Sequence, residues 1–123
     1  HGRARKAADY ARHEAALRAA VQALGCEVTS NMTSLVVLNL PPALAGREKE
    51  LVQAARAKGF GIWPTLSEPV QVRIGILNQL SEAAITDIVT RFAAEMNAMG
   101  ANVDLAAALN ALEHHFTAAM AAE

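Results

Sequence analysis

The chain has 123 residues, of which 53% are hydrophobic, and a formal net charge of −1. This length supports one compact domain and is too short for two independent cores. The near balance of 11 basic and 12 acidic residues produces no field of one sign, which disfavours nucleic acid or an anionic membrane as a partner. No apolar run reaches the length of a membrane span, and the N-terminal segment lacks the apolar core of a signal peptide.

The single cysteine and the first residue bear on the cellular compartment of the protein and on whether the sequence is part of a longer polypeptide. Cys26 has no partner for an internal disulfide, and a lone cysteine usually serves as a small buried hydrophobic residue in a reducing compartment. We therefore expect a cytoplasmic protein in which Cys26 has no redox role. The sequence begins with His1 and Gly2 rather than methionine, so we also expect a piece cut from a longer polypeptide.

The first half of the chain combines helical and strand patterns. Apolar residues recur at helical spacing from Arg3 to Leu24, and Gly25 is placed to end that helix. Residues 26–28 predict a short edge strand, and the β-branched run of residues 34–40 predicts a buried strand that Pro41 ends. The apolar positions of the first helix are Tyr10, Leu17, Val21 and Leu24.

A second helix and two further strands follow. Because proline is tolerated in a first helical turn, we expect a helix over residues 42–58 that Gly59 closes. Residues 60–63 predict a strand, and a turn over residues 64–69 leads into the strand that contains Arg73. The inner face of the helix would hold Leu44, Leu51, Val52 and Ala55.

Two more helices complete the pattern. Ser81 is a good N-cap for a helix that Gly100 ends, and Asn102 or Asp104 can cap the last helix. The apolar stripe of the first of these helices is Ile85, Ile88, Val89, Phe92, Met96 and Met99. The stripe of the last helix is Leu105, Leu109, Leu112, Phe116 and Met120.

The order of these elements is helix, two strands, helix, two strands, helix, helix. This order predicts an α+β fold, in which helices cover a small antiparallel or mixed sheet of about four strands. The long N-terminal helix and the extra C-terminal helix flank this unit. No repeat, linker or composition shift divides residues 1–123, so we expect a single domain.

Arg73 is the candidate functional residue, because it stands in an otherwise apolar strand. Successive side chains of a strand point to opposite faces, which places Val72 and Ile74 on one face and Arg73 with Gly75 on the other. Gly75 leaves room beside the guanidinium. An arginine fork matches a carboxylate bidentately, so the pattern suits a small carboxylate ligand. The alternative is that Arg73 pairs with a neighbouring acid at the edge of the sheet.

Other arrangements that could carry chemistry are missing from the sequence. The four histidines lack the helical spacing of a zinc site, and Glu113, His114 and His115 fit a solvated helix face. Nucleophile elbows and cysteine–histidine pairs do not occur. We therefore expect no catalytic residue and no metal ligand in this chain.

The segment Arg73-Ile74-Gly75, followed by Ile76-Leu77-Asn78 and the Ser81 helix, resembles the closing region of class V pyridoxal-phosphate aminotransferases of fold type I. The resemblance is to the group of alanine/serine-glyoxylate, pyridoxamine-pyruvate and aminoethylphosphonate transaminases, and it is clearest from about Leu17 to Met99. The other segments that carry it are Ala23-Leu24-Gly25-Cys26, Leu35-Val36-Val37-Leu38, Ala57-Lys58-Gly59 and Phe60-Gly61-Ile62-Trp63.

This resemblance implies that residues 1–123 form the small C-terminal domain of such an enzyme. Residues 1–24 would be the linking helix and residues 101–123 an additional C-terminal helix. Arg73 would bind the α-carboxylate of an amino acid or of a small oxo acid such as glyoxylate or pyruvate. Pyridoxal phosphate and its lysine would belong to a large domain absent from this chain, so Lys6, Lys49 and Lys58 inherit no catalytic role and the chain alone would be inactive. A homodimer is implied for the complete enzyme.

Two other functions remain open from the residues alone. An α+β sheet with one arginine could serve as a stand-alone amino-acid binding or dimerisation module without catalysis. The chain could also be a structural assembly segment that uses the stripe of its last helix, namely Leu105, Leu109, Leu112 and Phe116.

Overall fold

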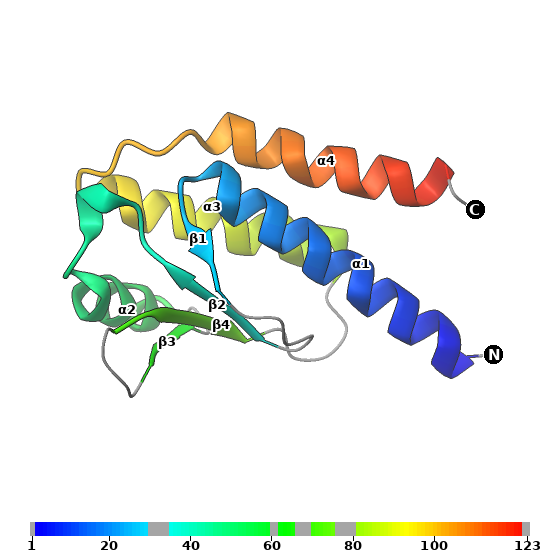
Figure 1. Ribbon diagram of the computed structural model, residues 1–123, viewed down its shortest axis with the longest axis horizontal. Helices are drawn as coiled ribbons and strands as arrows, with labels where there is room; N and C mark the ends of the chain where they lie inside the picture. Colours follow the sequence, from blue (N-terminus) through cyan, green and yellow to red (C-terminus); the bar gives the residue numbers. More distant parts are fainter. Residues whose placement is uncertain (1, 30–34, 60–61, 66–69, 76–80, 122–123) are drawn as a thin grey trace.

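The computed structural model describes residues 2–29, 35–59, 62–65, 70–75 and 81–121. These residues form an α+β fold of helices and one sheet, which confirms the predicted fold class (Figure 1). The helices are α1 (Gly2–Ala23), the 3-10 helix η1 (Pro42–Leu44), α2 (Glu48–Ala57), α3 (Glu82–Ala98) and α4 (Leu105–Ala121). The strands are β1 (Glu27–Val28), β2 (Leu35–Asn39), β3 (Ile62–Pro64) and β4 (Val72–Gly75).

The four strands form one antiparallel sheet in the order β1-β2-β4-β3. The sequence allowed an antiparallel or a mixed sheet, and the sheet is antiparallel because all three strand pairs are antiparallel. Strand β4 is an inner strand, with Val37 of β2 opposite Arg73 on one side and Trp63 of β3 opposite it on the other. The predicted arginine strand therefore lies inside the sheet rather than at its edge.

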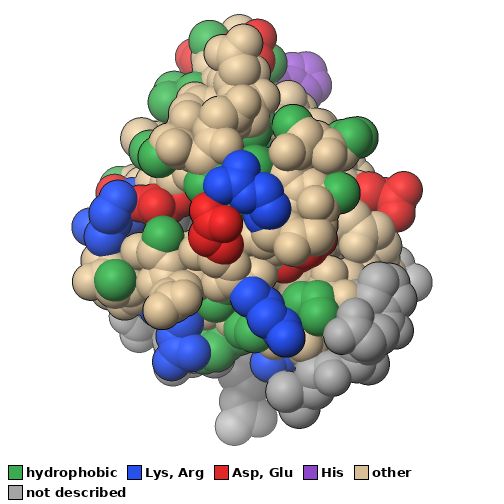
Figure 2. Space-filling model, turned by 90° about the vertical axis from the view of Figure 1, so that its left-hand side faces the viewer, with side chains coloured by type: hydrophobic (Ala, Val, Ile, Leu, Met, Phe, Trp, Pro, Cys, Tyr) green, Lys and Arg blue, Asp and Glu red, His purple; other side chains and the backbone are tan. Residues whose placement is uncertain are grey.

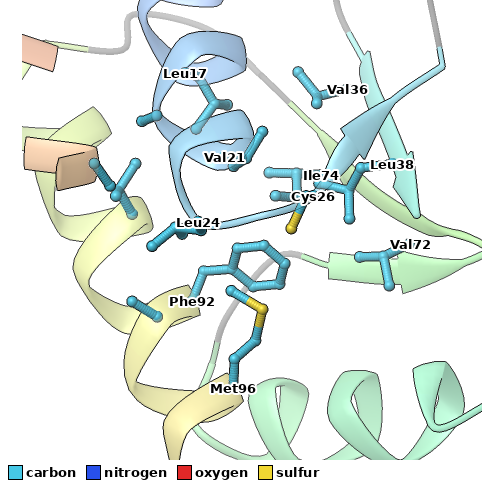
Figure 3. Close-up of a cluster of buried hydrophobic side chains, with 14 of the residues drawn as sticks. Leu17, Val21, Leu24, Cys26, Val36, Leu38, Val72, Ile74, Phe92 and Met96 are labelled. Atoms are coloured by element: carbon cyan, nitrogen blue, oxygen red, sulfur yellow. The ribbon is translucent and has the colours of Figure 1, made fainter. Parts of the chain in front are cut away.

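One face of the sheet, which we call the inner face, carries the core. Val36, Leu38, Ile62, Val72 and Ile74 alternate along their strands and are almost fully buried. Figure 3 shows the side chains of this face directed toward Phe92 and Met96 of α3 and toward the last turns of α1. Burial of large side chains such as Phe92 supplies the main driving force for folding.

The helices complete this core at residues that the sequence pattern predicts. Leu17, Val21 and Leu24 of the N-terminal segment are buried, as are the inner residues of α2 and α3. Helix α4 lies alongside α1 (Figure 1) and contributes Ala108 and Leu112 to the same core. Its stripe residues Leu105, Leu109 and Phe116 are partly buried and pack against this core, so the stripe is used within the chain.

Several helix ends confirm the predicted caps. The Ser81 hydroxyl accepts a hydrogen bond from the Ala84 N–H at 3.1 Å, and the Asp104 carboxylate accepts one from the Ala107 N–H at 3.0 Å. Of the two candidate caps for the last helix, Asp104 is therefore the one used. Gly100 follows α3 with φ +93°, a left-handed conformation that glycine adopts without strain.

The predicted helix over residues 42–58 is wrong in one respect, because it is broken. Helix η1 ends at Leu44, and Ala45 then adopts φ −57° and ψ 130°, which is extended backbone. Gly46 follows with φ +85° and its N–H donates to the Glu48 carboxylate at 3.2 Å. A left-handed residue cannot continue a right-handed helix, so α2 begins anew at Glu48.

Two predicted strands also differ at their ends. The strand predicted over residues 60–63 is Ile62–Pro64 in the structure, and Phe60 and Gly61 lie outside the described residues. The arginine strand covers Val72–Gly75, with the predicted alternation of faces. Residues 76–78, which follow this strand in the sequence, lie outside the described residues.

The surface agrees with the balanced composition. Figure 2 shows a face on which cationic and anionic side chains are interspersed, with apolar side chains scattered among them. Opposite charges also pair at the surface, where the exposed side chains of Arg47 and Glu50 form an ion pair at 2.6 Å. Among the described residues, none of the helices has the length and hydropathy needed to cross a bilayer.

Candidate functional site

The second face of the sheet, which we call the outer face, differs from the inner face in burial. Every described residue on it is half-buried or exposed, whereas the core residues of the strands all lie on the inner face. A polar ligand could therefore reach this face without displacing the core. Register places on it Glu27, Thr29, Val37, Asn39, Trp63, Thr65, Gln71 and Arg73.

Arg73 lies in the middle of the outer face, in a row that crosses three strands. Val37 is its partner on β2 and Trp63 is its partner on β3. Side chains of directly opposed residues in antiparallel strands stand on the same face, with Cβ atoms about 4.5–5.5 Å apart. Arg73 thus has an apolar residue on each side of it in the sheet, and we call the three residues Val37, Arg73 and Trp63 the arginine row.

The guanidinium has unused hydrogen-bonding capacity. The Nε atom of Arg73 is buried and has no hydrogen-bond partner among the described residues. Within the described part of the chain, the ion pairs join Arg18 to Glu14, Arg47 to Glu50, Lys58 to Glu95 and Arg91 to Asp87, and none involves Arg73. The alternative of pairing with an acid at the sheet edge thus finds no partner among these residues, and a buried donor without a partner favours binding of an acceptor.

A hydrogen-bonded polar network occupies the neighbouring part of the outer face. Gln71 Nε2 donates to Asn39 Oδ1 at 3.0 Å and to Thr29 Oγ1 at 2.9 Å. Asn39 Nδ2 in turn donates to Glu27 Oε1 at 3.0 Å. These bonds fix side chains from β1, β2 and the residue before β4, so the polar side of the arginine row is held in one arrangement.

The connection between β3 and β4 is held at both of its described ends. The Thr65 N–H donates to the Gln71 carbonyl oxygen at 2.9 Å, and the Gln71 N–H donates to Thr65 Oγ1 at 2.8 Å. Because Trp63 and Arg73 are each two residues from this bridge, their spacing across the sheet is set by backbone hydrogen bonds. The arginine row is therefore part of the rigid scaffold.

The described lysines do not lie in this site. Lys49 and Lys58 belong to the segment of α2, whose inner residues pack on the inner face, and Lys58 Nζ is paired with Glu95. Neither lysine therefore belongs to the outer-face site around Arg73.

The histidines and the cysteine play other roles in the structure. His13 of α1 meets Phe116 of α4 edge-on, with ring centroids 6.2 Å apart, and this contact contributes to helix packing. Cys26 is 5% exposed, and burial raises the pKa of its thiol from 9.0 to about 12. Among the described residues, no three His, Cys, Asp or Glu side chains are grouped closely enough to hold a metal ion.

Trp63, Asn39 and the network around Gln71 were not identified as site residues from the sequence. Alternation along a strand predicts which way a residue points, and this was enough to place Arg73. It does not predict which strands are neighbours or their register. The sequence did offer one signal for Trp63. This large aromatic residue directly follows the buried Ile62, and successive residues of a strand point to opposite faces.

The fold agrees with that of a solved enzyme structure. Ureidoglycine-glyoxylate aminotransferase from Bacillus subtilis matches with a TM-score of 0.68 and 20% sequence identity. The match covers 85% of this chain and 30% of that chain, so the present sequence spans less than a third of that protein. No protein-family model and no curated protein matches the sequence. The fold of this chain is thus the fold of a segment of an aminotransferase, which confirms at the level of structure the resemblance found in the sequence.

Proposed function

We propose that this chain is the substrate-carboxylate-binding part of a pyridoxal-phosphate-dependent aminotransferase, and that Arg73 binds the α-carboxylate. The single observation that carries the proposal is the half-buried Arg73 on the outer face, whose buried Nε has no partner in the part of the chain that the structure describes. The fold shared with a segment of an aminotransferase supports it. The substrates would be an amino acid and a small oxo acid such as glyoxylate or pyruvate.

The chemistry required of Arg73 is recognition and orientation. A guanidinium donates two parallel N–H bonds to the two oxygens of a carboxylate, and each bond to a charged group contributes about 1.5–3 kcal/mol. The apolar neighbours Val37 and Trp63 would shield this pair in part from water and so strengthen it. The α-carbon of the substrate is thereby held in one orientation relative to the sheet.

The cofactor would be held by another part of a longer polypeptide. Pyridoxal phosphate, when bound, acts as the electron sink for transfer of the amino group. The residues of the present chain would bind the substrate carboxylate and so orient the substrate toward the cofactor. A homodimer in the cytoplasm, the setting expected from the sequence, is part of the proposal.

Replacement of Arg73 in the complete polypeptide tests this role. We expect Arg73→Ala to raise the KM for the amino acid and the oxo acid about a hundredfold, because loss of about 3 kcal/mol corresponds to that factor. Pyridoxal phosphate should still bind, which its absorbance spectrum would report. Arg73→Lys should recover only part of the affinity, because an ammonium group lacks the planar fork.

Arg91→Ala is the matched control, because Arg91 is exposed on α3 and its one ion pair within the described ranges is with Asp87 at 3.3 Å. Its kinetics should equal those of the wild type. Unchanged KM values in Arg73→Ala, together with full activity, would show that the carboxylate binds elsewhere.

Calorimetry on the isolated chain tests the competing function. A stand-alone amino-acid binding module should bind alanine, serine, glyoxylate or pyruvate without any other segment. A part of an aminotransferase should bind none of them measurably, because Arg73 would supply one of several contacts. Clear binding by the isolated chain, abolished in Arg73→Ala, would therefore replace the enzyme proposal with the binding module.

A further inference from the structure

We infer that Trp63 is a specificity-determining residue, whose indole forms one wall of the Arg73 site and limits the size of the substituent beside the bound carboxylate. This inference rests on the proposed function of Arg73. It adds a residue and a selectivity for small substrates that the arginine alone does not imply. Its basis is the place of Trp63 in the sheet.

Trp63 is directed away from the core by the alternation of β3. Its neighbour Ile62 is fully buried on the inner face, opposite Ile74. Trp63 is the only tryptophan of a chain that is 4% aromatic, and it is half-buried on the outer face. Its indole therefore presents a large apolar surface on the same face as Arg73.

The register then brings Trp63 next to Arg73. The two residues are directly opposed across the β3–β4 pair, and Val37 is opposed to Arg73 on the other side. The two walls are unequal, because an indole is much larger than an isopropyl group. A substituent on a carboxylate bound to Arg73 would therefore meet a larger side chain on the β3 side than on the β2 side.

The wall is also fixed in place. Pro64 follows Trp63 and restricts the backbone, and the hydrogen bonds between Thr65 and Gln71 close the connection at 2.8 and 2.9 Å. The indole has only two side-chain torsions, so it loses little entropy when a ligand contacts it. A rigid wall discriminates by size, and one methylene group in an apolar pocket changes selectivity by about 10-fold to 200-fold.

Enzyme kinetics on the complete polypeptide with its cofactor test the inference. The acceptor series is glyoxylate, pyruvate, 2-oxobutyrate and 2-oxopentanoate. We expect Trp63→Ala to raise kcat/KM for 2-oxopentanoate relative to pyruvate by at least tenfold, because the space left by the indole admits the longer chain. Trp63→Phe keeps a flat but smaller wall, so its change in the same ratio should be smaller and in the same direction.

Four variants separate this inference from the proposed function. Ile62→Val alters β3 on the inner face, so it should change stability and leave the selectivity ratio unaltered. If Trp63→Ala and Trp63→Phe lower kcat/KM equally for all four acceptors, Trp63 has only a structural role and the inference is overturned while the function of Arg73 stands. If Arg73→Ala leaves kcat/KM unchanged for every acceptor, the proposed function itself fails.

Discussion

Alternation along β4 assigns opposite roles to neighbouring residues. Val72 and Ile74 are buried on the inner face and stabilise the core. Arg73 between them lies on the outer face, and its buried Nε has no partner among the residues that the structure describes. The same backbone hydrogen bonds hold all three. The strand that the core holds rigid therefore also fixes the backbone of Arg73, so the position of this binding residue depends on the same packing as the core.

Cys26 provides a test of burial at a single residue. Burial raises the pKa of its thiol from 9.0 to about 12 in the folded chain. The unfolded chain thus loses this proton at lower pH, so unfolding is favoured as the pH rises from about 9 toward 12. We expect the free energy of unfolding to fall through this window more steeply for the wild type than for Cys26→Ala, by up to about 1.4 kcal/mol per pH unit.

Urea unfolding at several pH values from 8 upward measures this slope. Lysine and tyrosine also titrate in alkaline solution, and the difference between the two proteins removes their contribution. Parallel curves would mean that the thiol is accessible to water in the folded state. Below about pH 9 the two curves should differ only by the constant cost of the small cavity.

At the scale of the elements, the bend between η1 and α2 depends on Gly46. Its φ of +85° is unfavourable for a residue with a Cβ, although an added Cβ would meet no atom within 4 Å. The left-handed conformation costs about 1–2 kcal/mol for alanine, partly offset by the lower entropy of the unfolded chain. We expect Gly46→Ala to lower the free energy of unfolding by about 1 kcal/mol, measured by urea denaturation.

Gly46→Asn is the matched variant, because asparagine tolerates this conformation better than alanine does. It should be the more stable of the two. An alanine variant as stable as the wild type would contradict the expected cost of the left-handed conformation at this position.

The sequence predicts most elements of this fold because their signals are local. The cap at Ser81, the stop at Gly100 and the alternation around Arg73 each depend on residues within one turn or one strand. The break at Gly46 was missed because proline at Pro42 and the apolar spacing from Leu44 both fit a helix. A single glycine within such a pattern does not reveal whether it adopts a left-handed conformation.

The candidate site was predictable only in part, since it is built from contacts distant in sequence. Arg73 could be recognised from its own strand. Its neighbours Val37 and Trp63 depend on the strand order β1-β2-β4-β3, and the bond between Gln71 and Asn39 joins residues 32 positions apart. Pairing over such distances is determined by the packing of the whole chain rather than by any local pattern.

At the scale of the whole molecule, contacts between distant elements join the helices into one unit. Arg47 Nη1 donates to the Met99 carbonyl oxygen at 2.9 Å, which ties the start of α2 to the end of α3. Lys58 at the end of α2 pairs with the buried Glu95 of α3. Helix α4 packs on both α1 and α3. The last helix is therefore expected to unfold together with the sheet.

Leu112 of α4 allows that cooperativity to be measured. It is 2% exposed and belongs to the same core as the sheet residues, so Leu112→Ala should lower the free energy of unfolding by about 2–5 kcal/mol. The neighbouring Glu113 is exposed, and Glu113→Ala should change it by less than about 0.5 kcal/mol. Circular dichroism reports the helices, and the fluorescence of Trp63, the only tryptophan, reports the sheet. If α4 belongs to the core, both signals should shift together to lower urea in Leu112→Ala. A shift of the helical signal alone, with the Trp63 transition unmoved, would show that α4 folds separately from the sheet that carries Arg73.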